Sequence, residues 1–230
     1  MQIECLRPEG NVHKVFLHPS NAVLSTDRSS EFCAQLEEFS YALIQSFLPG
    51  FLAQLTFQNI HMQIAIAQEL EGLPTFRTQT NFNAYAEGWG LYAEWLATEI
   101  DGTYLDPYSE FGRLGSEMWR AIRLVVDTGL HAKGWTEDEA NAYFLDNGPI
   151  TEAQARSEVR RYIVMPGQAT GYKIGMLRIQ ALRRKAEAAL GEAFDIRVFH
   201  DTILGGGAMP LTLLGAGVNR WIAEAQGSDA

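Results

Sequence analysis

The residues best suited to chemistry are two glutamates within the sequence NAYAEGWGLYAEWLATE. Glu87 and Glu94 are seven residues apart, and this offset returns to the same side of an α-helix. Aromatic residues flank both of them, so burial of the two carboxylates would be costly without a cation or hydrogen-bond donors. A metal or substrate site is one interpretation. The alternative is a solvent-exposed acidic stripe opposite an aromatic core face.

Glycines 88 and 90 interrupt the same predicted helix. Each glycine costs a helix about 1 kcal/mol relative to alanine. Their presence therefore indicates that another backbone or a ligand approaches this helix closely.

His61 is the next candidate, at the head of the amphipathic stretch HMQIAIAQELEG. Imidazole is a common zinc ligand, but no second histidine lies four residues away. The HExxH spacing that places two imidazoles on one zinc ion is therefore absent. The alternative interpretation is a structural, hydrogen-bonded histidine.

Four more polar residues could contribute to a site. His131 falls at the expected C-terminal end of a helix, where it either caps the helix or belongs to a site. Gln168 and Tyr172 are four residues apart on another helix, and the Tyr172 hydroxyl could donate to a developing oxyanion or simply bridge two helices. His200 stands shortly before three glycines, which could equally form a flexible turn.

The elements that must position these residues are helices, and the sequence predicts an all-α, multi-helix bundle. Apolar residues recur every three or four positions, and the capping boxes TEDE and TEAQ mark two helix starts. We expect an irregular N-terminal arm over residues 1–29, with short β-prone pieces such as VHKVFLH, and a helical domain over residues 30–230. The helices are expected at about 30–48, 53–71, 82–100, 107–133, from 137, from 152, 166–190, 194–204 and 210–225.

Composition limits the classes of partner and location. The net charge of −10 over 230 residues argues against nucleic acid, because phosphate binding needs a basic surface. No apolar run reaches the roughly 18 residues of a membrane span. Two cysteines without a pairing framework, and a start without the signal-peptide pattern, predict a cytoplasmic location.

Five blocks of the sequence, in order, resemble the C-terminal part of the bacterial domain-of-unknown-function family 885. They are HMQIAIAQELEGLPTFR, YAEGWGLYAE, VDTGLHAKGWT, EVRRYIVMPGQATGYKIG and FDIRVFHDTILGGGAMPLTLL, and they cover about residues 60–215. The resemblance implies a mostly helical, zinc-peptidase-like protein in which zinc-activated water attacks a peptide-like substrate. It implies metal ligands at His61 and Glu87, catalytic residues at His131 and Tyr172, and substrate-binding residues at Gln168 and His200.

The sequence departs from the family's zinc motif, which has the form HExxPGHHxQ. His61 and Gln63 match its last positions, but Gln54 and Leu55 replace the first histidine and the glutamate, and residues 58–60 replace PGH. One ligand, the general base and a second ligand are therefore missing. We expect little peptidase activity and a possible homo-oligomer through exposed apolar helix surface. The alternative is a non-catalytic helical binding domain.

Overall fold

The chain divides into two compact units, residues 1–49 and 50–230. The computed structural model describes strands within residues 2–24, and then residues 70, 72–80, 82–100, 103–104, 107–148 and 150–227. The predicted helices at 30–48 and 53–71 lie outside these residues, and so does the predicted boundary near residue 29.

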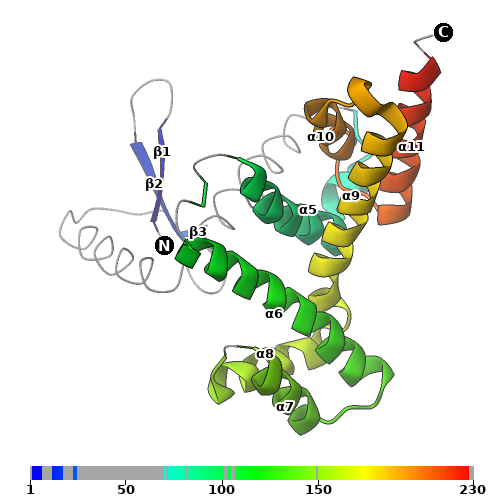
Figure 1. Cartoon of the computed structure of the whole chain (residues 1–230). Helices are drawn as coiled ribbons and strands as arrows, with labels where there is room; N and C mark the ends of the chain where they lie inside the picture. Colours follow the sequence, from blue (N-terminus) through cyan, green and yellow to red (C-terminus); the bar gives the residue numbers. More distant parts are fainter. Residues whose placement is uncertain are drawn as a thin grey trace. The chain divides into compact units, whose positions relative to one another are not determined.

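The first unit contains a small antiparallel sheet with the strand order β1-β2-β3 (Figure 1). The strands are β1 (Gln2–Leu6), β2 (Val12–Leu17) and β3 (Val23–Leu24). Gln2 pairs with Phe16, which in turn pairs with Leu24. The sequence analysis expected an irregular arm with short β-prone pieces here, and β2 falls within the piece VHKVFLH that it named. Valine and phenylalanine favour paired strands, but segments of two to six residues are too short to reveal a period of two.

The second unit confirms the all-α prediction for its described residues (Figure 1). The predicted helices from residue 82 onward are all present within a few residues of the expected ends. The short helix α4 was not predicted, because five residues make little more than one turn and show no periodicity. The elements are α4 (Thr75–Gln79), α5 (Asn83–Leu96), η1 (Ala97–Glu99), α6 (Pro107–Ala132), α7 (Glu137–Asn147), α8 (Glu152–Val164), α9 (Gln168–Leu190), η2 (Gly191–Ala193), α10 (Ile196–Leu204) and α11 (Leu211–Gly227).

Capping boxes fix the starts of α7 and α8, as the sequence predicted. The Thr136 hydroxyl accepts a hydrogen bond from the Glu139 amide at 3.2 Å, and the Glu139 carboxylate accepts one from the Thr136 amide at 2.8 Å. Thr151 and Gln154 make the same reciprocal pair. These bonds satisfy amide groups that have no partner within the helix.

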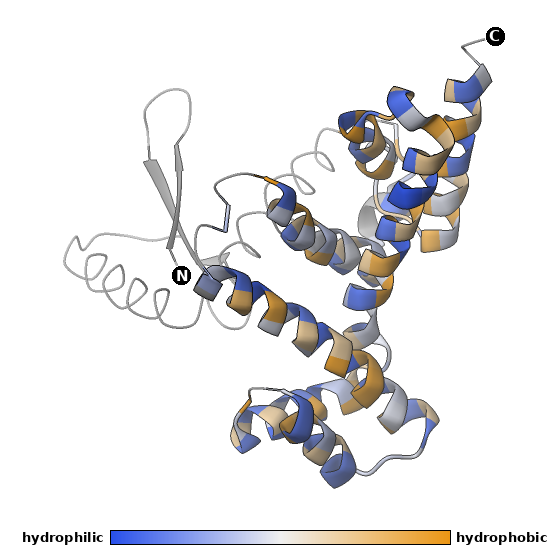
Figure 2. Ribbon diagram, in the orientation of Figure 1, coloured by the Kyte–Doolittle hydropathy of each residue, from blue (hydrophilic) through white to orange (hydrophobic). Residues whose placement is uncertain are grey.

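Two hydrophobic clusters hold the helices together, and Figure 2 shows hydrophobic and hydrophilic residues interspersed along each helix. One cluster joins α5, α9, α10 and α11 through residues such as Tyr92, Ile179 and Phe199. The other joins α6, α7, α8 and the start of α9 through residues such as Val126 and Phe144. Helix α9 therefore contributes buried residues to both clusters.

Gly88 of α5 and Gly175 of α9 explain how these two helices come so close. A Cβ atom added to either glycine would overlap backbone atoms of the other helix. Glycine alone permits this approach, since every other residue carries that atom. The prediction that another backbone approaches this segment closely is confirmed at Gly88.

Candidate functional site

The close crossing of α5 and α9 positions Glu87 and Tyr172. The Tyr172 hydroxyl donates a hydrogen bond of 2.8 Å to Oε1 of Glu87. Both side chains are half-buried. Burial raises the pKa of the Tyr172 phenol, and the negative charge of Glu87 raises it further. The phenol is therefore protonated at neutral pH and available as a donor.

Two arginines of α6 lie beside the Tyr172 ring. The guanidinium carbon of Arg123 is 4.3 Å from the ring centroid, and that of Arg120 is 5.7 Å from it. Both distances are within the range of cation–π attraction. Helix α6 therefore places two positive charges beside the Glu87–Tyr172 pair of α5 and α9.

Gln168 connects this group to both neighbouring helices. Its side-chain oxygen accepts a hydrogen bond of 2.9 Å from Nη2 of Arg123. Its backbone oxygen accepts one of 2.9 Å from the Asn83 side chain at the start of α5. The structure thus brings three of the predicted site residues together: Glu87, Gln168 and Tyr172.

Glu94, two turns beyond Glu87 on α5, is buried, with only 1% of its surface exposed. The solvent-exposed acidic stripe is therefore contradicted at this position. Burial raises the pKa of the Glu94 carboxyl to about 7, and nearby Arg120 and Ser116 offset only part of that rise. Neither carboxylate oxygen completes a well-formed hydrogen bond with the described residues. A neutral carboxyl is the form that this environment favours.

His131 and His200 make contacts outside the Glu87–Tyr172 pair. The exposed His131 lies eight residues beyond Arg123 on α6, about 12 Å along the helix, and its Nε2 atom is 3.0 Å from the Tyr162 carbonyl oxygen. His200 lies 3.0 Å from the Tyr92 hydroxyl, and burial lowers its pKa. His61 lies outside the described residues. The catalytic, substrate and metal roles of these three histidines stay predictions.

Arg120 and Arg123 are the site residues that the sequence analysis missed. A signal was available, because Arg123 and Asp127 follow the buried residues Ile122 and Val126 one position later on the same helix. Asp127 accepts a hydrogen bond from the Gly167 amide at 3.1 Å, just before α9 begins. Polar residues so close to the apolar face of a long helix point toward the bundle and not toward solvent.

The described residues do not complete a zinc site. Catalytic zinc needs three protein ligands. Among the described residues, no three histidine, cysteine, aspartate or glutamate side chains converge as metal ligands. We therefore derive no catalytic step through zinc.

One family model matches most of the chain. The model of the DUF885 family, "Bacterial protein of unknown function", matches residues 61–218. The chain is similar to the crystal structure of a putative lipoprotein from Colwellia psychrerythraea, with 43% identity and a TM-score of 0.71, covering 74% of this chain and 30% of that one. A comparison with curated proteins gave no match.

A second solved structure supports the fold alone. It is a putative lipoprotein of unknown function from Shewanella oneidensis, with 22% identity and a TM-score of 0.69, and the match covers 91% of this chain and 36% of that one. The chain thus spans about a third of the length of the solved structures that it resembles.

The predicted cytoplasmic location is wrong. Both solved relatives are described as lipoproteins, which points to an exported or membrane-anchored class of protein. Cysteine number and spacing report on disulfide and metal chemistry, and they do not report on export. Of the helices in the described residues, none has the length and hydropathy to cross a membrane.

Proposed function

The chain belongs to the DUF885 family of bacterial proteins of unknown function, and on this premise we propose that its helical unit is part of a zinc-dependent, hydrolase-like protein. The substrate class is peptide-like, and the chain alone has little peptidase activity. The observation that carries the proposal is the 2.8 Å hydrogen bond from Tyr172 to Glu87 across the α5–α9 crossing. A phenol and a carboxylate held together at a helix crossing are the types of group that hydrolytic sites use.

The Tyr172 hydroxyl is the candidate donor to a substrate oxygen. Its raised pKa keeps the proton on the phenol at neutral pH, and Arg123 over the ring favours negative charge nearby. The phenol has one proton, which Glu87 accepts in this structure, so donation to a substrate carbonyl oxygen requires that this hydrogen bond be exchanged. Gln168 holds the arginine in this position.

Little activity is expected because Leu55 occupies the place of the family's glutamate. A leucine side chain cannot accept a proton, so the base that would activate water is missing. Gln54 likewise replaces the first histidine ligand. The remaining expected ligands, His61 and Glu87, are fewer than the three that catalytic zinc sites use.

The test measures zinc content and peptide hydrolysis on the purified chain. We expect far less than one zinc per chain and no chelator-sensitive hydrolysis. A variant that restores the motif through Gln54→His, Leu55→Glu and Ile60→His should gain zinc, and adding Glu87→Gln should remove that gain.

The matched control for that test is Glu152→Gln, since the Glu152 carboxylate is 67% exposed on α8. It should leave zinc binding by the restored variant unchanged. Rapid, chelator-sensitive hydrolysis by the unaltered chain would overturn the expected low activity. Failure of the restored variant to bind zinc would overturn the zinc proposal itself.

A second candidate function is a non-catalytic helical interaction domain. The observation that favours it is a row of exposed apolar side chains on one face of α6, among them Phe111, Leu114 and Met118. Such a row is typical of a surface that another helix covers, in a homo-oligomer or in another part of a larger protein. Zinc binding by the restored variant separates the two candidates, because an interaction domain needs no metal.

A further inference from the structure

Arg120 and Arg123 stand one turn apart on α6 and both approach the Tyr172 ring. Arg123 is only 4% exposed and Arg120 is half-buried. Two positive charges in so small and poorly hydrated a space repel each other. Their burial is costly unless anions compensate for it.

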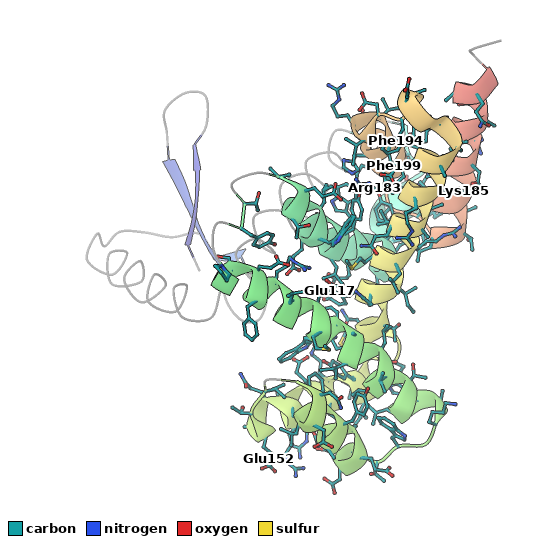
Figure 3. All side chains as sticks on the ribbon, in the orientation of Figure 1. Glu117, Glu152, Arg183, Lys185, Phe194 and Phe199 are labelled. Atoms are coloured by element: carbon teal, nitrogen blue, oxygen red, sulfur yellow. The ribbon has the colours of Figure 1, made fainter. Side chains whose placement is uncertain are left out.

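Neighbouring cations in the same layer do have carboxylate partners. Arg113 pairs with Glu110 at 2.7 Å and with Glu117 at 2.8 Å. Lys173 of α9 also pairs with Glu117, which Figure 3 labels on α6. The cations Arg113 and Lys173 are thus each paired with at least one carboxylate.

Arg120 and Arg123 differ, because their hydrogen bonds go to neutral groups. Nη1 of Arg120 donates to the Ser116 hydroxyl at 2.7 Å, and Nη2 of Arg123 donates to Gln168. Within the described part of the chain, neither arginine forms an ion pair, and the Nε atom of each is buried without a hydrogen bond. Nη2 of Arg120 and Nη1 of Arg123 also make no hydrogen bond with a described residue.

Nearby carboxylates act on the two arginines without forming an ion pair: Glu87 and Glu94 on Arg120, and Glu158 on Arg123. Glu87 accepts the hydrogen bond of Tyr172 and lies beyond ion-pair distance of both arginines. Glu94 is buried, and its carboxyl is partly protonated near neutral pH because its pKa is about 7. Both guanidinium groups therefore keep donors that no described residue uses.

We infer that Arg120 and Arg123 form a binding site for the carboxylate group of a peptide-like ligand, next to Tyr172. Guanidinium groups present forked donors that match the two oxygens of a carboxylate. Gln168 and the Tyr172 ring fix the orientation of Arg123 before a ligand arrives. Only the identity of the ligand as a substrate rests on the proposed function, since carboxylate binding requires neither zinc nor hydrolysis.

The experiment is calorimetric titration of the metal-free chain with the dipeptide Ala-Ala and with its C-terminal amide. We expect Ala-Ala to bind, more weakly at higher salt, and the amide to bind at least about tenfold more weakly. Arg120→Gln and Arg123→Gln should each reduce Ala-Ala binding at least about tenfold, because each removes a charged donor. Arg160→Gln is the control, since that side chain is 67% exposed on α8, and it should change nothing.

Several results would overturn the inference. These are equal binding of the acid and the amide, unchanged binding in both glutamine variants, and no Ala-Ala binding by the unaltered chain. Equally tight binding of inorganic phosphate would overturn the assignment to carboxylate. If a glutamine variant does not fold, Arg123→Lys keeps the charge but loses the fork, and it should still weaken binding. Zinc and hydrolysis are measured separately, so either proposal can fail alone.

Discussion

Tyr172 on α9 donates a hydrogen bond of 2.8 Å to Glu87 on α5, although the two residues are 85 positions apart in the chain. The bond lies beside the glycine contact that brings the two helices together. The site and the tightest helix crossing are therefore the same part of the fold. A change to either one is expected to affect the other.

The first prediction concerns the strength of this bond. Tyr172→Phe should lower the free energy of unfolding by about 1–2 kcal/mol, because hydrogen bonds to charged groups contribute about 1.5–3 kcal/mol and both residues are partly solvated. A double-mutant cycle with Glu87→Gln, measured by urea denaturation, should give a coupling near 1 kcal/mol. Tyr143→Phe is the control, since the Tyr143 hydroxyl bonds to no described residue. A coupling indistinguishable from zero would contradict the observed contact.

The second prediction concerns the crossing itself. Gly88→Ala and Gly175→Ala should each destabilise the protein by about 3 kcal/mol or more, because the added methyl group would overlap the backbone of the facing helix. Gly217→Ala in α11 is the matched control, since a Cβ there meets nothing within 4 Å. That change should stabilise the helix by up to about 1 kcal/mol. Thermal unfolding of the three variants tests the prediction, and similar shifts in all three would refute it.

The contrast between these glycines shows what the sequence could and could not reveal. Gly88 was identifiable because glycine is unfavourable within a helix, which is a local property. That Gly175 is its partner could not be identified, because 87 residues separate the two glycines and only packing brings them together. The caps at Thr136 and Thr151 were predictable for the same local reason.

In the candidate site, too, local properties could be predicted from the sequence, and contacts made by packing could not. Glu87 and Tyr172 are in contact, but their roles as metal ligand and catalytic residue stay predictions. Arg123 was missed, because an arginine on an amphipathic helix is exposed by default, and it is buried here because Tyr172 of α9 and Tyr162 of α8 pack against it. Glu94 also could not be assigned, since the sequence fixes its helical face but not what covers that face.

The third prediction follows from the burial of Glu94. Its pKa in the folded protein, about 7, is above the ordinary value of 4.5, so the folded state binds this proton more tightly than the unfolded chain does. The resulting stability is fully present below about pH 4.5 and is lost as the pH rises through 7.

Glu94→Gln should therefore match the unaltered protein near pH 4 and be more stable by about 3 kcal/mol near pH 8, because glutamine carries no charge to bury. Urea denaturation at the two pH values measures the difference. Glu224→Gln is the control at an exposed position of α11 and should show no such pH dependence. A stability difference that is the same at both pH values would contradict the buried position of this carboxyl.

The last prediction concerns the apolar face of α6. Four side chains share this face, because Leu114, Met118 and Val125 follow Phe111 by three, seven and fourteen residues. Their exposed fractions are 72% for Phe111, 50% for Leu114, 52% for Met118 and 38% for Val125. The solved relatives are about two and a half times as long as this chain, so an equivalent face can be covered in a longer protein. When the chain is isolated, the same face is free to pair with a second copy.

We expect the purified chain to self-associate as its concentration rises, and Leu114→Lys combined with Met118→Lys to reduce this association at least about tenfold. Two charges placed on the apolar face must lose water in any interface that covers it, which is costly. Sedimentation velocity over a concentration series measures the effect, and Leu145→Lys is the control at a 40% exposed leucine of α7. A monomer at every concentration would refute self-association. Association that persists in the double variant would place the interface elsewhere on the chain.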